Sequence, residues 1–590
     1  MLGPSKPLPH GDEFASPEDY VDQLLEFSST SDMLQILCGG VHIIDFFTNE
    51  PGLFRSILPT DWHNFLLSCD IMRLLDVLLR DDLSKPLEDV EMQPPQSFLE
   101  YVASVRKFSL RRDHDSRKKE KLPTLPHPVS VGMKPKKIHE VTSFASYVQR
   151  LSEDLQKHSG TDITHFVDFG SGQNYLGRAL ASEPYNRRVV AVEGRENNVN
   201  AAKGLDVFSG LAKRQVVMRN KKLYQQMRNK SRGPNGVVDE DALEKAIKQA
   251  SEDGAFDFRP ISELVAQYSA EQGKGSVQYV SGRLDSGELS EVIAQIDKPS
   301  DDTPATSTDK SLMAVSIHSC GNLSHYGIRS LVLNPDIHAV AIVGCCYNLL
   351  TERLGPPTYK HAYLRPTLQA VNGRVMRESE KRDPQGFPMS DKYKSYNDQG
   401  VRLNITARMM ACQAPANWDR AESEAFFTRH YYRTVLQRIF LDRGVVQKIN
   451  HRDPENVGSD SPFEISTSPV TIGSMPKSCY KNLRSYVRGV VKKLTTSTEF
   501  KEYGQVMTEK MADITDEEIE EYERIFEPRR KEICIVWTLM SFSAVVVESL
   551  IVSDRWTWLR EQQDVREAWV ETVFDYAQSP RNLVVVGIKR

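Results

Sequence analysis

The sequence predicts an α/β fold, in which a mainly parallel sheet carries helices on both faces. A mainly helical N-terminal domain and a helical insert before the last strands are predicted to accompany the sheet. Residues 166–180, FVDFGSGQNYLGRAL, have the pattern of a strand, a glycine turn and a helix. Short continuous apolar runs are typical of parallel strands that are buried on both faces. Such runs follow at residues 189–192, 277–280, 312–317 and 339–344.

With 590 residues, the chain is longer than a single compact core usually allows, so more than one domain is expected. Changes in composition and the order of the predicted elements suggest four regions. These are a helical N-terminal accessory domain at 1–125, a core at 130–365 with insertions at 206–274 and 296–310, a helical and loop region on the substrate side at 366–530, and a C-terminal helix and strand at 531–590 that complete the core.

The composition narrows the functional class. A formal net charge of −5 argues against a globally basic nucleic-acid binder, although it permits a local basic patch. The eight cysteines include no CxxC pair, which favours a reducing compartment, the cytoplasm or the nucleus. The N-terminus lacks the apolar segment of a signal peptide. The apolar stretch 533–552 is long enough to span a membrane, but it contains Glu548, so we interpret it as a buried core helix and expect no membrane contact.

The glycine turn predicts a cofactor site. Glycines let the main chain approach a ligand closely, and the following helix start offers free N–H donors. The third glycine, Gly177, does not have the spacing of a dinucleotide motif, and no phosphate-binding loop is present at this turn. An acid shortly before the turn and another at the tip of the next strand favour S-adenosylmethionine, whereas a plain turn without a ligand is the alternative. The predicted cofactor-binding residues are Asp168, Gly170, Ser171, Gly172, Asn174, Glu193, Arg283 and Leu284.

Several motifs in a fixed order resemble one known family. VDFGSGQNYLGRAL, HSCGNL, GCCYNLLTE, GFPMS, RMMACQAPANW and PRNLVVVGIK together resemble the methyltransferase-like protein 25 family, which includes relatives named for a ribosomal-RNA-adenine-dimethylase domain. The resemblance runs from about Lys134 to the C-terminus and leaves out both insertions. It implies a class I, Rossmann-like methyltransferase fold and S-adenosylmethionine as cofactor. The HxCG and CC motifs also look like those of tRNA ribose methyltransferases, which favours RNA as substrate.

The predicted catalytic residues are His318, Cys320 and Tyr347. Many class I enzymes that methylate amino groups of bases have an Asn/Asp-Pro-Pro-aromatic motif after the fourth strand. This chain has His318-Ser319-Cys320-Gly321 there, which argues against simple base N-methylation. His318 is either a general base towards a hydroxyl or a residue that holds its loop through a backbone hydrogen bond. Cys320, Cys345 and Cys346 are candidates to cluster with His318 at neighbouring strand tips, but their spacing matches no zinc motif, so no metal is predicted.

Three functions remain open from the sequence. The favoured one is methylation of RNA, either tRNA or rRNA. The alternatives are a protein methyltransferase on the same scaffold and a non-catalytic adaptor that binds S-adenosylmethionine. The basic segment 213–232 and the side chains of Arg484, Arg488 and Lys492 are either RNA contacts or solvated helix faces. The N-terminal helical domain is a candidate surface for a partner protein. The sequence does not determine the oligomeric state.

Overall fold

The structure is a computed structural model of the chain. It describes residues 2–48, 50–88, 91–113, 122–214, 221–232, 238–252, 266–267, 274–280, 282, 285–296, 310–354, 383–450, 465–467, 469–470 and 472–590. Parts of both predicted insertions therefore lie outside the described residues.

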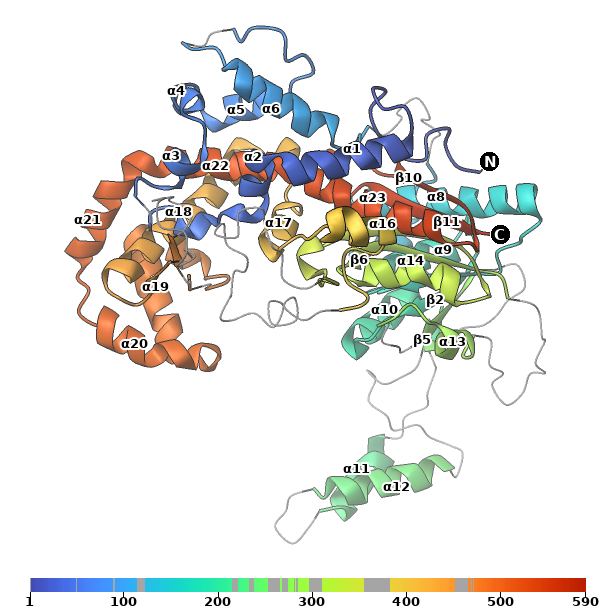
Figure 1. Cartoon of the computed structure of the whole chain (residues 1–590). Helices are drawn as coiled ribbons and strands as arrows, with labels where there is room; N and C mark the ends of the chain where they lie inside the picture. Colours follow the sequence, from blue (N-terminus) through green and yellow to red (C-terminus); the bar gives the residue numbers. More distant parts are fainter. Residues whose placement is uncertain are drawn as a thin grey trace.

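Within the described residues, the main sheet has seven strands in the order β10-β11-β7-β6-β1-β2-β5 (Figure 1). The strands are β1 (His165–Phe169), β2 (Arg188–Val192), β5 (Ser276–Val280), β6 (Leu312–Cys320), β7 (Ile337–Cys345), β10 (Val565–Thr572) and β11 (Leu583–Lys589). The five strands β7, β6, β1, β2 and β5 are parallel to one another. In contrast, β11 is antiparallel to both β7 and β10. This sheet confirms the predicted Rossmann-like α/β fold.

Both faces of the sheet are covered, because alternate residues of each strand belong to two different hydrophobic cores. Along β1, Val167 and Phe169 lie in one core and Phe166 lies in the other. Such double burial explains why the strands have continuous apolar runs rather than alternating ones. The second core includes residues of α8 (Pro135–Ser159) and α9 (Tyr175–Ala181), and the first includes residues of α14 (Leu323–Leu333). Further elements beside the sheet are α7 (His127–Ser130), α10 (Glu196–Ser209) and α13 (Ser290–Ile293).

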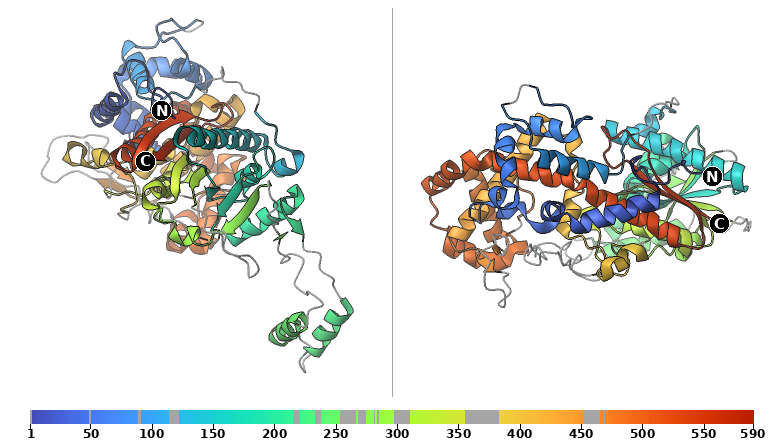
Figure 2. Two further views of the ribbon diagram at one scale, coloured as in Figure 1. Left: turned by 90° about the vertical axis from the view of Figure 1, so that its right-hand side faces the viewer. Right: turned by 45° about the horizontal axis from the view of Figure 1, so that its top comes forward.

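The N-terminal helices share the first core with helices from the C-terminal part of the chain (Figure 2). They are α1 (Pro17–Thr30), α2 (Asp32–Gln35), α3 (Leu53–Ile57), α4 (Thr60–Ser68), α5 (Ile71–Leu79) and α6 (Gln96–Lys107). Ser16 caps α1 as its sequence indicates, since its hydroxyl accepts the N–H of Asp19 at 3.0 Å. The C-terminal helices are α16 (Asp391–Ser395), α17 (Ile405–Met410), α18 (Arg420–Asp442), α19 (Leu483–Thr496), α20 (Lys501–Met511), α21 (Asp516–Phe526), α22 (Arg530–Ser543) and α23 (Val545–Glu561).

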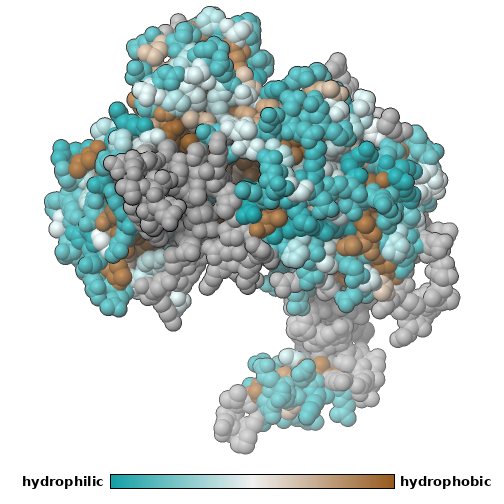
Figure 3. Space-filling model, in the orientation of Figure 1, coloured by the Kyte–Doolittle hydropathy of each residue, from teal (hydrophilic) through white to brown (hydrophobic). Residues whose placement is uncertain are grey.

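The apolar stretch 533–552 lies within α22 and α23. By length and composition alone, the helical segment Asp516–Glu561 is long and apolar enough to cross a membrane, but 94% of its apolar window is buried inside the protein. The face of the molecule in Figure 3 shows hydrophobic residues only as small, separate patches. The burial agrees with a core helix, and the localisation of the protein stays a prediction.

Three smaller units complete the described structure. The helices α11 (Lys221–Lys230) and α12 (Glu240–Glu252) lie together, apart from the main body (Figure 1). Two short antiparallel pairs are β3 (Lys213–Arg214) with β4 (Ala266–Gln267), and β8 (Lys448–Asn450) with β9 (Ile465–Thr467).

Two arginines on the predicted basic face of α19 pair with an acid of the same chain but stay 45% exposed, so contact of this face with RNA stays a prediction. Arg488 contacts Asp516 at 2.7 Å, and Arg484 lies 3.5 Å from the same carboxylate. Asp516 belongs to α21, which packs against α19. Two of the three basic side chains that the sequence offered as RNA contacts are therefore paired within the protein. The sequence did not indicate this pairing, because Asp516 lies on a different helix.

Candidate functional site

The glycine turn after β1 is bound to the end of β2. Gly170 and Gly172 have φ angles of 63° and 57°, a region that favours glycine. The backbone N–H groups of Gly170 and Ser171 donate to the carbonyl oxygen of Val192 at 3.0 and 3.2 Å. The turn thus brings main-chain atoms to the carboxyl edge of the sheet, where ligands bind in open α/β folds.

Glu193 follows β2 and holds the same turn. Its Oε2 accepts the N–H of Gly172 at 2.9 Å, and its Oε1 accepts the N–H of Arg195 at 2.8 Å. The side chain is only partly buried. Because an ionised carboxylate has about four acceptor positions, Glu193 retains capacity for ligand hydroxyls.

Asp168 is a buried carboxylic acid next to the turn. It is 4% exposed, and no described residue makes a hydrogen bond with its side chain. Burial raises the pKa of Asp168 to about 8, with nearby Lys137 lowering it and Glu193 raising it further. A buried acid without a partner is suited to pairing with a cationic ligand.

The other predicted cofactor residues have different surroundings. The hydroxyl of Ser171 is buried and has no hydrogen-bond partner among the described residues. Asn174 is fully buried and faces inward, where its Nδ2 donates to the hydroxyl of Tyr279 at 3.0 Å. A side chain at Gly177 would collide with that of Asn174, so the third glycine serves packing. Arg283 and Leu284 lie outside the described residues.

Tyr279 and Asn174 belong to a buried polar network. The Tyr279 hydroxyl donates to Asp206 at 2.5 Å, and Asp206 pairs with Arg178 at 2.9 Å. This network fixes α9 and α10 against β5. Asn174 therefore supports the glycine turn from the interior of the protein. Its direct contact with a cofactor stays a prediction.

His318, near the end of β6, is held by a glutamate that the sequence did not reveal as functional. Its Nε2 lies 3.0 Å from Oε2 of Glu140 on α8. Glu140 is 1% exposed and also contacts Lys137 at 2.9 Å and the hydroxyl of Ser579 at 2.8 Å. Burial by itself raises the pKa of Glu140, but His318 and Lys137 outweigh burial and lower it to about 2.

The position of Glu140 in the sequence indicates that it is buried, but not which residue it contacts. Glu140 stands four residues before Phe144, which is one turn of helix, so both lie on the buried face of α8. A carboxylate on such a face needs a partner. The periodicity thus indicates burial, but His318 is 178 residues away in the chain. The sequence left open that His318 holds its loop through a backbone hydrogen bond. In the structure, His318 instead bonds the side chain of Glu140.

The predicted clustering of three cysteines is confirmed. Sγ of Cys320 lies 3.3 Å from Sγ of Cys345 and 3.4 Å from Sγ of Cys346. Hydrogen bonds from the other two thiols lower the pKa of Cys346, and His318 and Arg581 add to that effect. Cys320 is exposed at the end of β6, so it is accessible as the sequence-based role requires. Its part in catalysis stays a prediction.

The hydroxyl of Tyr347 is buried and bonded to another side chain of the protein. The residue is 1% exposed, and its hydroxyl donates to Oε1 of Glu548 at 2.6 Å. Burial raises the pKa of Tyr347, and the Glu548 carboxylate raises it further. This placement disfavours the catalytic role predicted for Tyr347.

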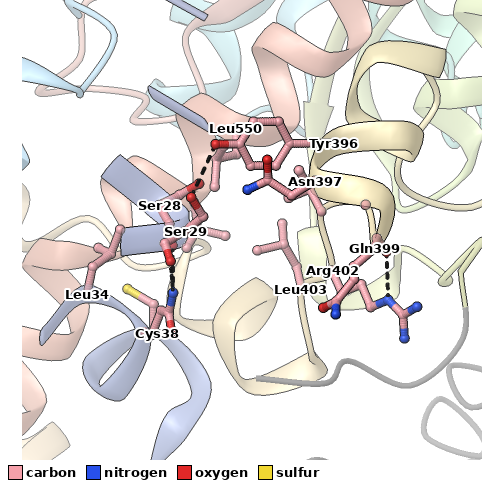
Figure 4. Close-up of a pocket in the computed structure, with 14 residues that line it drawn as sticks. Ser28, Ser29, Leu34, Cys38, Tyr396, Asn397, Gln399, Arg402, Leu403 and Leu550 are labelled. Atoms are coloured by element: carbon pink, nitrogen blue, oxygen red, sulfur yellow. Dashed lines mark hydrogen bonds between the residues drawn. The ribbon is translucent and has the colours of Figure 1, made fainter. Parts of the chain in front are cut away.

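Two pockets of the structure lie away from the glycine turn. One, of about 380 Å³, is lined by residues of α1, α2 and the segment 396–403, including Ser29, Tyr396 and Arg402 (Figure 4). The other, of about 910 Å³, lies beside α8 and β10. Neither is lined by Gly170, Gly172 or His318. The chemical groups described above therefore identify the candidate site better than these hollows do.

Comparison with known proteins agrees with this geometry. Residues 136–353 match a protein family described as a methyltransferase domain. The matched range contains the parallel strands β1, β2, β5, β6 and β7, the glycine turn and His318. Residues 136–353 form a methyltransferase domain. The methyltransferase fold that the motifs implied is thereby confirmed.

The chain is also distantly homologous to curated proteins. Two of them, from Homo sapiens and Mus musculus, are named "Probable methyltransferase-like protein 25" and are each 27% identical to this chain over 281 residues. The match covers 47% of this chain and 37% of each relative. The chain thus matches little more than a third of the length of these relatives.

The residues of the methyltransferase domain fit the cofactor that such a domain implies, S-adenosylmethionine. The unpaired acid of Asp168 suits the ammonium group of the methionine part. At Gly172, the nearest atom to an added Cβ is 4.0 Å away, so the turn is open on that side. Glu193 stands where ribose hydroxyls are bound in related α/β sites. These roles remain predictions for each residue.

Binding of S-adenosylmethionine at pH 7 is expected to release about one proton. Asp168, with a pKa of about 8, is mostly protonated in the free protein at that pH, and contact with an ammonium group ionises it. The affinity should therefore rise with pH up to about 8. Calorimetric titration in two buffers of different ionisation enthalpy counts the protons. Asp168→Asn should abolish the release, and a wild-type value near zero would contradict this role for Asp168.

Proposed function

We propose that this protein transfers a methyl group from S-adenosylmethionine to a hydroxyl group of RNA, with a ribose hydroxyl as the acceptor. The observation that carries the proposal is the contact between His318 and the buried Glu140 at the carboxyl edge of the sheet. The match to a methyltransferase domain supports the reaction class.

His318 is placed to act as a general base. Glu140 has a pKa of about 2 and is ionised at neutral pH, so it can only accept a hydrogen bond. Nε2 of His318 must then carry the hydrogen, which leaves Nδ1 of the neutral ring as the basic nitrogen. The side chain of His318 is 40% exposed, so an acceptor can approach it.

A hydroxyl acceptor needs such a base. A hydroxyl group must lose its proton as it forms a bond to carbon, and general-base catalysis contributes about 10²–10⁴-fold to such steps. When bound, S-adenosylmethionine supplies an activated methyl group. The protein then has to position the acceptor, accept its proton at His318 and exclude water.

The charge of α11 supports RNA as the substrate class. Its sequence, KKLYQQMRNK, contains four lysine or arginine residues and no acid. The pair α11–α12 stands apart from the main body in Figure 1 and in the left view of Figure 2. The second helix of the pair, α12, is acidic, with the sequence EDALEKAIKQASE. Within this pair, α11 is therefore the helix suited to contacting phosphates at a distance from the reaction site.

Transfer assays with tritiated S-adenosylmethionine and fractionated cellular RNA and protein test the proposal. Label is expected in RNA, in dinucleotides that resist alkaline cleavage, because a methylated ribose hydroxyl can no longer attack the neighbouring phosphate. Label in alkali-sensitive nucleotides would contradict the ribose acceptor. Label only in protein would favour a protein methyltransferase. Cofactor binding without any labelled macromolecule would favour the adaptor.

Replacing His318 with alanine is expected to lower kcat by about 10²–10⁴-fold while leaving the affinity for S-adenosylmethionine unchanged. The matched control is His338→Ala, since His338 lies at the opposite, amino-terminal end of β7 and is also half-buried. Single-turnover kinetics and calorimetry separate the two effects. Equal activity of both variants would refute the role of His318 as the base.

A further inference from the structure

Three thiols meet at the carboxyl ends of β6 and β7. Cys320 and Cys345 are register partners in the parallel pairing of the two strands. The three Sγ–Sγ distances are 3.3 Å between Cys320 and Cys345, 3.4 Å between Cys320 and Cys346, and 3.7 Å between Cys345 and Cys346. Among the described residues, these cysteines form the group of three or more His, Cys, Asp or Glu side chains whose ligand atoms all lie within 4.8 Å of one another.

An unusual backbone conformation brings the third thiol to the other two. Consecutive side chains of a strand point to opposite faces, so Cys345 and Cys346 would ordinarily diverge. Cys346 instead has a φ of 42° and a ψ of 54°, the left-handed region that non-glycine residues rarely adopt. This turn places both sulfurs on the same side. Such strain is often associated with functional sites.

A second tight turn fixes the position of Cys320. Gly321 follows it with a φ of 56°, and a side chain at this position would collide with the carbonyl of Leu349. Leu349 belongs to the short helix Tyr347–Leu349 that follows the cysteine pair. The two turns therefore pack directly on each other and hold the sulfurs together from both strands.

We propose that Cys320, Cys345 and Cys346 bind a single thiophilic metal ion, with Zn²⁺ as the expected ion. This site goes beyond the proposed methyl transfer and does not depend on it. Two sulfurs that bind one tetrahedral ion at about 2.3 Å lie about 3.8 Å apart. The observed separations are shorter by at most about 0.5 Å, so the thiols need to spread only slightly to bind an ion.

Three protein ligands leave a fourth position for an exchangeable ligand. Cys345 is buried, whereas Cys320 is exposed and Cys346 half-buried, so the cluster is open to solvent on one side. The loop that follows Cys320 reaches the glycine turn, since a side chain at Gly170 would lie 2.7 Å from Cδ2 of Leu323. The fourth position therefore lies at the same edge of the sheet as the proposed cofactor site.

Metal titration of the reduced, chelator-treated protein tests the site. We expect one Zn²⁺ per chain in competition with a chromophoric chelator, and a thiolate-to-metal absorption band when Co²⁺ is used as a probe. The double variant Cys345→Ser/Cys346→Ser should lose at least about 100-fold in Zn²⁺ affinity, because the removal of second-layer partners alone costs 10–100-fold. The control is Cys479→Ser, because Cys479 has a half-buried thiol outside the cluster.

Protection of the wild-type protein provides a test without any substitution. Zn²⁺ should slow alkylation of Cys320 and Cys346 by iodoacetamide, read by mass spectrometry, and leave Cys479 unaffected. Equal Zn²⁺ affinity in the double variant and the control would overturn the proposal. So would the absence of a Co²⁺–thiolate band in the wild type. A disulfide within the cluster that persists in the isolated protein, with no metal bound after reduction, would identify a redox pair instead.

Discussion

Replacing Glu548 with alanine is expected to lower the free energy of unfolding by about 3–5 kcal/mol, because it leaves buried arginines without the opposite charge that they contact. Glu548 on α23 is 3% exposed. Its carboxylate contacts Arg112, pairs with Arg581 at 2.7 Å and accepts the hydroxyl of Tyr347. Urea unfolding followed by tryptophan fluorescence measures the loss.

The pH dependence of this contribution has a defined sign. Burial by itself raises the pKa of Glu548, but Arg112 and Arg581 outweigh it, and the pKa lies below its ordinary value of 4.5. The contribution is therefore present above about pH 4.5 and is lost as the pH falls through the lowered pKa of the folded state.

An exposed ion pair provides the control for Glu548. Glu521 on α21 pairs with Arg524, and their side chains are 50% and 74% exposed. Glu521→Ala should change stability by less than about 0.5 kcal/mol, because solvent screens such pairs. Similar losses in both variants would show that the buried cluster of Glu548 does not stabilise the fold as argued.

Replacing Gly172 with leucine is expected to weaken S-adenosylmethionine binding by at least about 100-fold, equivalent to about 2.7 kcal/mol. An added Cβ at Gly172 points into open space, with the carbonyl oxygen of Gly170 as its nearest atom at 4.0 Å. A longer side chain would fill the space beside the turn and keep the ligand away from the main chain. Calorimetric titration measures the affinity.

A leucine substitution at a second glycine with the same conformation is the control for backbone strain. Gly160 ends α8 with a φ of 69°, and an added Cβ there meets nothing within 4 Å. Leucine at either position suffers the left-handed penalty of about 1–2 kcal/mol, but only Gly172 lies at the turn. Unchanged affinity in Gly172→Leu, with the fold intact, would refute the cofactor site.

Much of the cofactor region could be predicted because its signals are local in the chain. Asp168, Gly170 and Gly172 lie within five residues, and Glu193 directly follows the next strand. Asn174 was also predicted to bind the cofactor. It has a left-handed conformation, and its side chain lies in the interior, where it donates to Tyr279. Neighbours in sequence thus share a region, but backbone dihedrals decide which of them face a ligand.

The acceptor region was less predictable because its partners are distant in the chain. Glu140 anchors His318 across 178 residues, and Glu548 binds Tyr347 across 201. A sequence pattern reports that Glu140 and Glu548 lie on buried faces, but it does not report what they pair with. Tyr347 consequently looked available for catalysis, whereas the fold uses its hydroxyl to satisfy a buried carboxylate.

By itself, the sequence determined the parallel strands and the last strand of the main sheet, the glycine turn with its two acids and the methyltransferase class of the domain, but it did not predict β10 at the edge of the sheet. These features depend on hydrophobic periodicity and on contiguous motifs, which act over a few residues. The tertiary structure decided the partner of His318, the burial of Tyr347, the pairing of Arg484 and Arg488, and the convergence of three thiols. Those contacts join separate elements, and they depend on strand register and side-chain direction, which local patterns do not specify.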